Sequence, residues 1–535
     1  MKNFNKTKTI DMKNFIKKTI SFLLVVSPSV LYSQSNCHYN VSDYGAKGDS
    51  TTDNTIMIQS TINICSENGG GTVFIPQGVY MTGTLFIKDN TVLFLSPGSE
   101  LRAIPELNSF PLSIPKTPSN FNIFFHHALI YAENVNNIGI KGQGIINGQG
   151  YAEAFKQTTW KKPDRYQNRP GLVRLVNCNN IRIENIELIN SAFWTLHLMA
   201  SSDIVIHGIT LNSRTSNYNN DGIDVDGCEN VRISDCYINS VDDAISIKAT
   251  GERPAKRVII NNCILSSHCN AIRVGAENFA GFEDIHFSNC HIFNSKLGIT
   301  FQNIDGFKMK RISFQGITMN EIGIPIYIIT GRKTYPIGVP EEEYPCQPGK
   351  FPASIEDLKF DNIYGNNIGY YKGVGTGGDS TTTNSRTAII LSGHKDALLK
   401  RCSMNNINFH FNGGGTLEDN DVILPDISNI PNPSFKSTPV YGLITRYTEN
   451  LSLANINFTY EEPDKRSAMI IEKGINTSIK NINVQTDESN PVIKWHGGTK
   501  PYISDCSVSI TNNKIESING NAAKIEESNN SIFEN

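Results

Sequence analysis

The sequence predicts an all-β fold, a single-domain right-handed parallel β-helix, from the spacing of its apolar residues. Ile223 is followed 22 residues later by Ile245 and a further 27 residues later by Ile272, and each has a second apolar residue two positions on. Apolar and polar residues alternate within each segment, which is the pattern of a strand with one buried face. Asn, Gly and Ser separate the segments. Short strands at such a repeat are typical of a parallel β-helix.

The N-terminus has the features of an export signal. Lys13, Lys17 and Lys18 precede an apolar run at residues 20–26, and small residues follow the run. This arrangement predicts a cleaved signal peptide at residues 1–33 and a secreted or periplasmic protein. The alternative is a short hydrophobic anchor, but the run is too short to span a bilayer.

The rest of the chain, residues 34–535, is expected to form one β-helix domain with catalytic residues on its surface. Residues 52–66 have helical character, and we expect them to cap the open N-terminal end of the solenoid. Residues 331–386 contain a Pro-rich acidic run and a Gly/Thr/Ser-rich run. We interpret this segment as a long loop excursion rather than a second domain.

Composition excludes several classes of function. The formal net charge of −3 is nearly balanced, which argues against a nucleic-acid binder. No stretch after the N-terminus approaches the ~20 apolar residues of a membrane span. Cys236, Cys263 and Cys290 recur every 27 residues, which indicates a ladder in the core, although the disulfide state stays open. No Cys/His spacing of metal-site type occurs, so we expect neither a metal nor a cofactor.

Chemically reactive residues gather at outward positions of neighbouring coils. Residues that flank a buried strand position point away from the core, and they stack from coil to coil. One outward row contains Arg174, His197, Asp224, Ser246, Arg273, Thr300 and Tyr327. A second row, three residues earlier in each coil, contains Trp194, Asp221, Asp243, Asn270 and Leu297. A solvated surface rarely concentrates Asp, Arg, His and Trp in this way, so the rows indicate a site.

The carboxylates are the chemically informative part of this site. Asp221 and Asp243 occupy equivalent positions on adjacent coils, about 5 Å apart at the backbone. Asp242 is expected to diverge from Asp243, and an inverting glycosidase needs ~6.5–9.5 Å between its acid and base. Clustered like charges also raise at least one pKa, as general acid catalysis requires. Two alternatives stay open, namely a structural ladder of Asp and Asn at turns, and a calcium site.

These residues resemble the motifs of glycoside hydrolase family 28, which contains polygalacturonases and rhamnogalacturonan hydrolases. Residues 219–221 (Asn-Asn-Asp) and 242–248 (Asp-Asp-Ala-Ile-Ser-Ile-Lys) match its two aspartate motifs, and the resemblance covers most of residues 40–330. It implies that Asp242 is the general acid, that Asp221 and Asp243 activate the attacking water, and that the anomeric carbon is inverted. Substrate binding is then expected at Asn219, Asp224, His197, Trp194, Arg273, Asn270, His268, Arg174 and Lys248.

Two departures from the family pattern concern the substrate. The histidine of the Gly-His-Gly motif falls on Asn270, with His268 nearby, and the Arg-Ile-Lys motif falls on residues 300–302 (Thr-Phe-Gln). Both cations of the second motif are therefore missing. We expect Arg273 to take over as the anion contact, unless it pairs structurally with Asp224. The substrate is then a rhamnogalacturonan, another uronate-containing glycan or a sulfated one.

The predicted function is an exported hydrolase of cell-wall polysaccharide. We expect it to be monomeric, with a polysaccharide or oligosaccharide substrate and with no nucleic-acid or membrane partner. One alternative is a non-catalytic β-helix that binds polysaccharide, motivated by the missing His, Arg and Lys. Another is a polysaccharide lyase, for which Arg273 is the only obvious base in the rows.

Overall fold

The computed structural model describes residues 37–159, 164–213, 218–332, 340–349, 353–372, 382–424, 437–486, 491–510, 514–517 and 525–527. Residues 1–38 and 39–535 form two separate units, and the second unit contains the candidate site. The predicted signal peptide at residues 1–33 lies outside the described residues. Among the described residues, no helix has the length and apolar character needed to cross a membrane.

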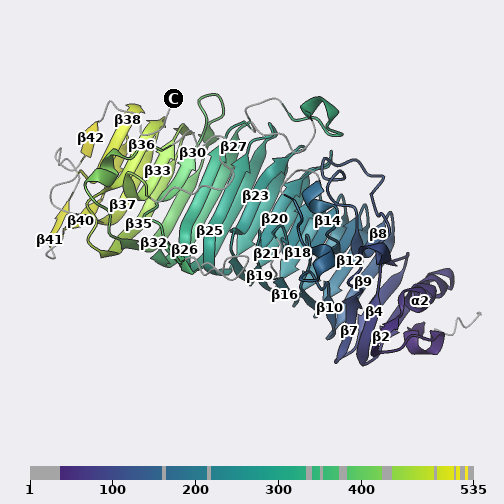
Figure 1. Cartoon of the computed structure of the whole chain (residues 1–535). Helices are drawn as coiled ribbons and strands as arrows, with labels where there is room; N and C mark the ends of the chain where they lie inside the picture. The colour runs from purple at the N-terminus through teal and green to yellow at the C-terminus, as the bar shows by residue number, and fades with distance from the viewer. Residues whose placement is uncertain are drawn as a thin grey trace, which may run out of the picture. The chain divides into compact units, whose positions relative to one another are not determined.

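The second unit is a parallel β-helix, as predicted, with its strands stacked in rows (Figure 1). The row that carries the candidate site begins with β5 (Leu85–Phe86), β8 (Ala128–Glu133), β11 (Gly171–Val176), β14 (Leu196–Met199), β17 (Ile223–Asp226), β20 (Ile245–Ala249) and β23 (Asn270–Asn278). It continues through β25 (His291–Asn303), β26 (Met309–Thr330), β30 (Ile389–Ser392), β33 (Val440–Arg446), β36 (Ser467–Gly474) and β38 (Ile493–Gly498).

Two further rows complete each coil. The second row contains β3 (Gly71–Ile75), β6 (Thr91–Leu95), β9 (Asn136–Gly142), β12 (Asn179–Glu184), β15 (Ser202–His207), β18 (Glu229–Ser234), β21 (Ala255–Asn261) and β24 (Phe282–Ser288). The third contains β2 (Asp49–Asp53), β4 (Gly78–Thr82), β7 (Ser99–Ala103), β10 (Ile145–Asn147), β13 (Glu187–Ile189), β16 (Thr210–Ser213), β19 (Tyr237–Ser240) and β22 (Ile264–Ser267).

Beyond β24, long strands pass from one row to the next. β27 (Ile355–Ile368), β32 (Ser403–Gly413), β35 (Ser452–Glu462) and β37 (Ser478–Thr486) stack in parallel on β26. The remaining strands are β28 (Tyr370–Lys372), β29 (Thr382–Asn384), β31 (Leu399–Lys400), β34 (Thr448–Glu449), β39 (Tyr502–Ser504), β40 (Ser507–Ile510), β41 (Lys514–Ser517) and β42 (Ile525–Glu527).

The interior of the β-helix is the apolar ladder that the repeat predicts. Ile223 pairs with Ile245, and Ile245 pairs with Ile272, in parallel register, and all three side chains are fully buried. The ladder of Cys236, Cys263 and Cys290 is buried as well, and the described cysteines form no disulfides. Burial of one face on every coil is what fixes the direction of the outward residues.

The ends and the excursion follow the sequence less closely. Helix α2 (Thr55–Glu67) forms where helical character was expected, and it buries Ile58 and Ile62 beside the first strands. Residues 331–386 do not form a loop throughout, because they contain the long strand β27. Leu358 and Ile363 there are buried and pair with Ile312 and Ile317 of β26, so apolar alternation places this part of the excursion in the β-helix.

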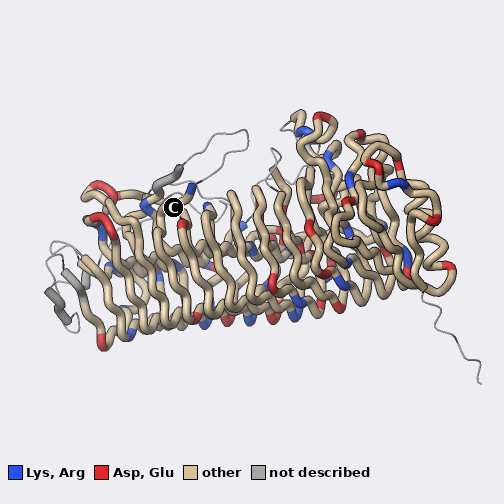
Figure 2. Tube along the Cα trace, turned by 90° about the horizontal axis from the view of Figure 1, so that it is seen from below, with Lys and Arg blue, Asp and Glu red and all other residues tan. Residues whose placement is uncertain are grey.

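A ladder of charged and amide side chains lies at one turn of the coils. Its members are Asn180, Asp203, Asn230, Arg257, Asp284, Arg311, Asp357 and Arg401, all with φ between 53° and 59°. Asn and Asp tolerate this left-handed conformation better than other residues with side chains. Figure 2 shows Lys and Arg alternating with Asp and Glu along one edge of the coils. We call this set the turn ladder.

Candidate active site

Asp221 lies in the turn before β17, and Asp242 and Asp243 lie in the turn before β20, whereas Asp224 lies on β17 itself. The backbone N–H of Gly222 donates to the carbonyl of Asp243 at 2.8 Å, and that of Ala244 donates to the carbonyl of Asn270 at 2.9 Å. These bonds lock the three turns in register. Asp221, Asp243 and Asn270 are therefore stacked on successive coils, as the sequence predicts.

Asp242 is the most accessible of the three aspartates. Its side chain is half-buried, whereas Asp221 and Asp243 are buried. The backbone N–H and the side-chain amide of Asn219 donate to Asp242 Oδ2 at 3.2 and 3.3 Å, and the backbone N–H of Asp243 donates to Oδ1 at 3.1 Å. Among the described residues no cation lies within ion-pair distance of Asp242. Neutral donors therefore orient this carboxyl.

Asp221 is bound to a buried lysine. Lys248 Nζ lies 3.2 Å from Asp221 Oδ2, 3.4 Å from Asp224 Oδ1 and 3.6 Å from Glu277 Oε2. It also lies 4.6 Å from the centre of the Trp194 ring. The side chain of Lys248 is only 4 % exposed, so its charge is directed to these carboxylates rather than to solvent.

Burial has the largest effect on the pKa values of the carboxyls around Lys248. It raises the pKa of Asp221 well above its usual range, and it raises the pKa of Asp224 to about 8, with Lys248 opposing both shifts. Burial alone would lower the pKa of Lys248. The attraction of Asp224, Asp221 and Glu277 outweighs burial and holds the pKa of Lys248 above its usual value. The site therefore retains both a buried ammonium and carboxyls that bind protons tightly.

Asp243 belongs to a second network on the next coil. Arg273 Nη1 lies 3.2 Å from Asp243 Oδ2, and Asn270 Nδ2 donates to Asp243 Oδ1 at 2.6 Å. Burial raises the pKa of Asp243, and the charge of Arg273 opposes the rise. Arg273 therefore pairs with Asp243 and not, as one alternative had it, with Asp224.

The two positions that lack the family cations complete the second network. Gln302 Oε1 accepts a hydrogen bond from Arg273 Nη2 at 2.7 Å, and Thr300 Oγ1 donates to Asn270 Oδ1 at 2.6 Å. Both side chains are fully buried. Thr300 and Gln302 thus position the residues that hold Asp243.

Three of the expected substrate contacts lie beneath a covering segment. Trp194 stacks on Phe121 with ring centroids 4.9 Å apart, and Arg174 Nη1 donates to the carbonyl of Phe125 at 2.6 Å. His197 Nε2 lies 3.1 Å from Asp226 Oδ2, and burial lowers the pKa of His197 to about 4. These residues point outward from the strands, but residues 119–125 cover them. They therefore pack beneath the covering segment and are not exposed for substrate binding.

The turn between β22 and β23 brings a thiol to the aspartates. His268 and Cys269 are half-buried there, after Ser267, whose hydroxyl donates to the Asp242 carbonyl at 2.7 Å. One oxygen each of Asp242 and Asp243 and the Cys269 sulfur all lie within 4.8 Å of one another. The two carboxylates therefore do not diverge as expected. A thiol is also a poor ligand for calcium, which binds oxygen.

Sequence reasoning missed two members of the site. Glu277 and Lys296 were not singled out, although Glu277 lies 3.6 Å from Lys248 Nζ. Lys296 directly precedes Leu297 of the second outward row, so extending that row by one residue would have found it. Glu277 lies near the end of β23, in the stretch where the pairing with β20 shifts register, and the simple repeat cannot place it.

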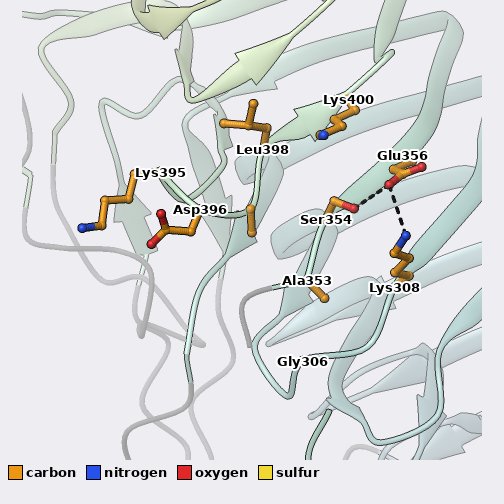
Figure 3. A pocket seen from close by; sticks show the side chains of 10 residues that line it. Gly306, Lys308, Ala353, Ser354, Glu356, Lys395, Asp396, Leu398 and Lys400 are labelled. Atoms are coloured by element: carbon orange, nitrogen blue, oxygen red, sulfur yellow. Dashed lines mark hydrogen bonds and ion pairs between the residues drawn. The ribbon is translucent and has the colours of Figure 1, made fainter. Parts of the chain in front are cut away.

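A hollow of about 560 Å³ lies away from these carboxylates (Figure 3). It is lined by Gly306, Lys308, Ala353, Ser354, Glu356, Lys395, Asp396, Ala397, Leu398 and Lys400. Two of its three lysines face glutamates, since Lys308 lies 3.9 Å from Glu356 and Lys400 lies 3.4 Å from Glu449. Its charges thus largely satisfy one another.

Comparisons with known proteins find similarity to families of polysaccharide-processing enzymes. The model described as "Glycosyl hydrolases family 28" matches residues 119–375, and the model "Rhamnogalacturonase A/epimerase, pectate lyase-like" matches residues 38–101. A Vitis vinifera protein described as "Probable polygalacturonase" is 30 % identical over 313 residues, which is 54 % of this chain and 62 % of that protein. The match therefore spans less than two thirds of that relative's length.

Solved structures show the same fold. The Family 28 exopolygalacturonase of Yersinia enterocolitica superimposes with a TM-score of 0.61 at 18 % identity, covering 89 % of this chain and 78 % of that one. The exopolygalacturonase of Thermotoga maritima gives a TM-score of 0.56 at 18 % identity, covering 79 % and 91 %.

Proposed function

We propose that this chain is a hydrolase of glycoside hydrolase family 28 that cleaves a pectic polysaccharide, with Asp242 as the general acid. Asp221 and Asp243 would activate the attacking water. The observation that carries this assignment is the unequal environment of the three aspartates. Asp221 and Asp243 each face a buried cation, whereas Asp242 is half-buried and faces only neutral donors.

The roles follow from accessibility and charge. A general acid must reach the glycosidic oxygen, and Asp242 is the aspartate with an accessible side chain. A general base needs an ionised form that accepts a proton readily. The cations beside Asp221 and Asp243 favour this ionised form, and they oppose burial, which raises both pKa values.

Inversion at the anomeric carbon is part of this proposal. It rests on the family and on one water activated by the two buried aspartates. The nearest oxygens of Asp242 and Asp243 lie within 4.8 Å, closer than the ~6.5–9.5 Å between the carboxyls of most inverting pairs. NMR of the first-formed product measures the outcome directly: the anomer opposite to that of the substrate supports inversion, and the same anomer contradicts it.

The activity is tested on a panel of polygalacturonate, rhamnogalacturonan and a sulfated algal polysaccharide. We expect new reducing ends from at least one pectic substrate and hydrolytic products by mass spectrometry. Unsaturated products would indicate a lyase instead. Arg273, the expected lyase base, is held by Asp243 and Gln302, which argues against that chemistry. Binding without turnover across the panel would contradict the hydrolase proposal in favour of a carbohydrate-binding β-helix.

We also propose that the protein is exported and acts outside the cytoplasm. The support is the sequence pattern of residues 1–33, with lysines before an apolar run. Expression of the full chain followed by N-terminal sequencing of the protein outside the cytoplasm tests it. A mature N-terminus near residue 34 is expected, and retention of the uncut chain in the cytoplasm would contradict export.

A further inference from the structure

The two cations inside the candidate site are already neutralised. Lys248 is bound by Asp221, Asp224 and Glu277, and Arg273 is bound by Asp243 and Gln302. Their side chains are 4 % and 11 % exposed. A substrate carboxylate would have to break a buried ion pair to reach either one. An anionic substrate therefore needs a different cation.

Lys296 is a cation two coils from Asp242 and Asp243, with the coil of Cys269 and Asn270 between them. The backbone N–H of Leu297 donates to the carbonyl of Cys269 at 2.9 Å, and Leu297 pairs in register with Asn270. Lys296 is therefore stacked beside Cys269, whose sulfur lies within 4.8 Å of oxygens of Asp242 and Asp243.

The ammonium group of Lys296 is not engaged in an ion pair with any of the described residues. Its side chain is half-buried, and no carboxylate of the described residues lies within ion-pair distance of it. Its charge already acts on its surroundings: burial, Asp242 and Asp243 raise the pKa of the Cys269 thiol, and the charges of Arg273 and Lys296 oppose that rise. A partly desolvated cation without a protein partner is well suited to bind an anionic ligand.

The excursion at residues 331–386 adds a second lysine nearby. Strand β28 ends at Lys372, whose backbone N–H donates to the side-chain oxygen of Asn294 at 3.0 Å. Asn294 precedes Lys296 by two residues on the same coil, and the side chain of Lys372 is exposed. The excursion thus adds a second cation beside Lys296, which the repeat alone does not supply.

We propose that Lys296, with Lys372 as an outer neighbour, binds the carboxylate of a uronate unit at the cleaved bond. This assignment rests on the proposed hydrolase function and deepens it. In this chain positions 300 and 302, where the family pattern has its two cations, are buried and serve Asn270 and Arg273. Lys296 then selects acidic over esterified galacturonan.

The test compares Lys296→Met, Lys296→Arg and the control Lys359→Met, an exposed lysine of β27. Kinetics are measured on polygalacturonate and on its methyl ester. We expect Lys296→Met to raise KM for polygalacturonate by roughly 10- to 100-fold, as for a lost bond to a charged group. KM for the methyl ester should change little, Lys296→Arg should retain most of the preference, and Lys372→Met should have a smaller effect.

Equal changes of KM on both polymers, or no change, would overturn the assignment. A second measurement separates this inference from the proposed function. Calorimetry of trigalacturonate binding to Asp242→Asn, with and without Lys296→Met, reports the carboxylate contact without turnover. Weaker binding in the double variant supports Lys296 even where hydrolysis is absent, and unchanged or undetectable binding by both proteins overturns it.

Discussion

Charged residues are stacked from coil to coil in two regions of this β-helix, and the two regions differ in solvent exposure and in the arrangement of positive and negative charges. In the turn ladder, signs alternate: Arg311 Nε donates to Asp284 Oδ1 at 2.6 Å, and Arg401 Nε donates to Asp357 Oδ1 at 2.7 Å. These side chains are about half exposed. In the candidate site, three aspartates and Glu277 share two cations, and most of these groups are buried.

The difference separates a structural ladder from a chemical site. Charges of opposite sign in water satisfy one another, and each exposed pair contributes little. Like charges in a buried cluster cannot all ionise, so protons stay bound at pH values where isolated carboxyls lose them. The sequence pattern is the same for both stacks, namely Asp residues at an equal spacing. Burial and sign decide which stack can do acid–base chemistry.

Replacing one aspartate in each region should give the largest difference in turnover between the two regions. Asp242→Asn keeps the shape of the side chain but removes the proposed acid, and turnover should fall by at least ~10²–10⁴-fold. The matched control is Asp203→Asn in the turn ladder, where Asn230 already occupies the next coil. It should leave turnover unchanged. Reducing-sugar kinetics and circular dichroism measure both, and near-normal turnover by Asp242→Asn would remove it from the acid role.

Removing a buried cation should have the next largest effect. Lys248→Met leaves Asp221, Asp224 and Glu277 without their shared partner, and breaking a buried pair costs about 3–5 kcal/mol. We expect a lower melting temperature and weak activity, because Asp221 would retain its proton. Lys310→Met is the control, since that lysine is more exposed and lies near the turn ladder. Equal stability of the two variants would mean that the buried pairs contribute no more than the exposed ones.

The inner face of the fold was predictable, because strand alternation is a local property. The register from Ile223 to Ile245 to Ile272 is confirmed, and so is the stacking of Asp221 and Asp243 that follows from it. The sequence alone left open whether those aspartates form a ladder or a site. Spacing carries no information about burial.

The outer face was less predictable, because segments outside the repeat decide what covers it. Arg174 and His197 point outward as expected, yet residues 119–125 bury them. The ion-pair partner of Arg273 depends on how far its side chain extends toward the neighbouring coil. The guanidinium contacts Asp243 rather than Asp224. Lys372 lies on a strand that pairs antiparallel with another strand of the excursion. The spacing of the repeat does not extend to this pair, so it could not predict the position of Lys372.

The pH dependence of stability gives a finer test of the buried region. A carboxyl with a raised pKa binds its proton more tightly in the folded chain than in the unfolded one. Its contribution to stability is therefore present below the unfolded pKa, about 4, and is lost as pH rises toward 8, the raised pKa of Asp224. Asp224→Asn should lose less of its melting temperature between these pH values than the parent protein.

The control for that measurement is again Asp203→Asn, whose pH profile should run parallel to that of the parent. A parallel profile for Asp224→Asn as well would mean that other groups, such as Asp221, dominate the proton uptake of the buried region. Thermal melts of the parent protein and both variants, recorded at low ionic strength at each pH between these two values, measure the three profiles.

The smallest effect is expected in the turn ladder itself. Arg311→Gln removes a cation that faces Glu283 and Asp284, but its side chain is 44 % exposed and water already screens the pair. We expect a melting temperature within roughly 2 °C of the parent, and a difference that shrinks further as salt is added. Arg273→Gln is the matched change in the site, where Asp243 would remain buried without its cation. That variant should melt clearly lower at every salt concentration, because a buried pair is screened little. If Arg311→Gln melted as low as Arg273→Gln, exposure would not distinguish the two stacks, and the alternation of sign along the ladder would be the property that stabilises the coils.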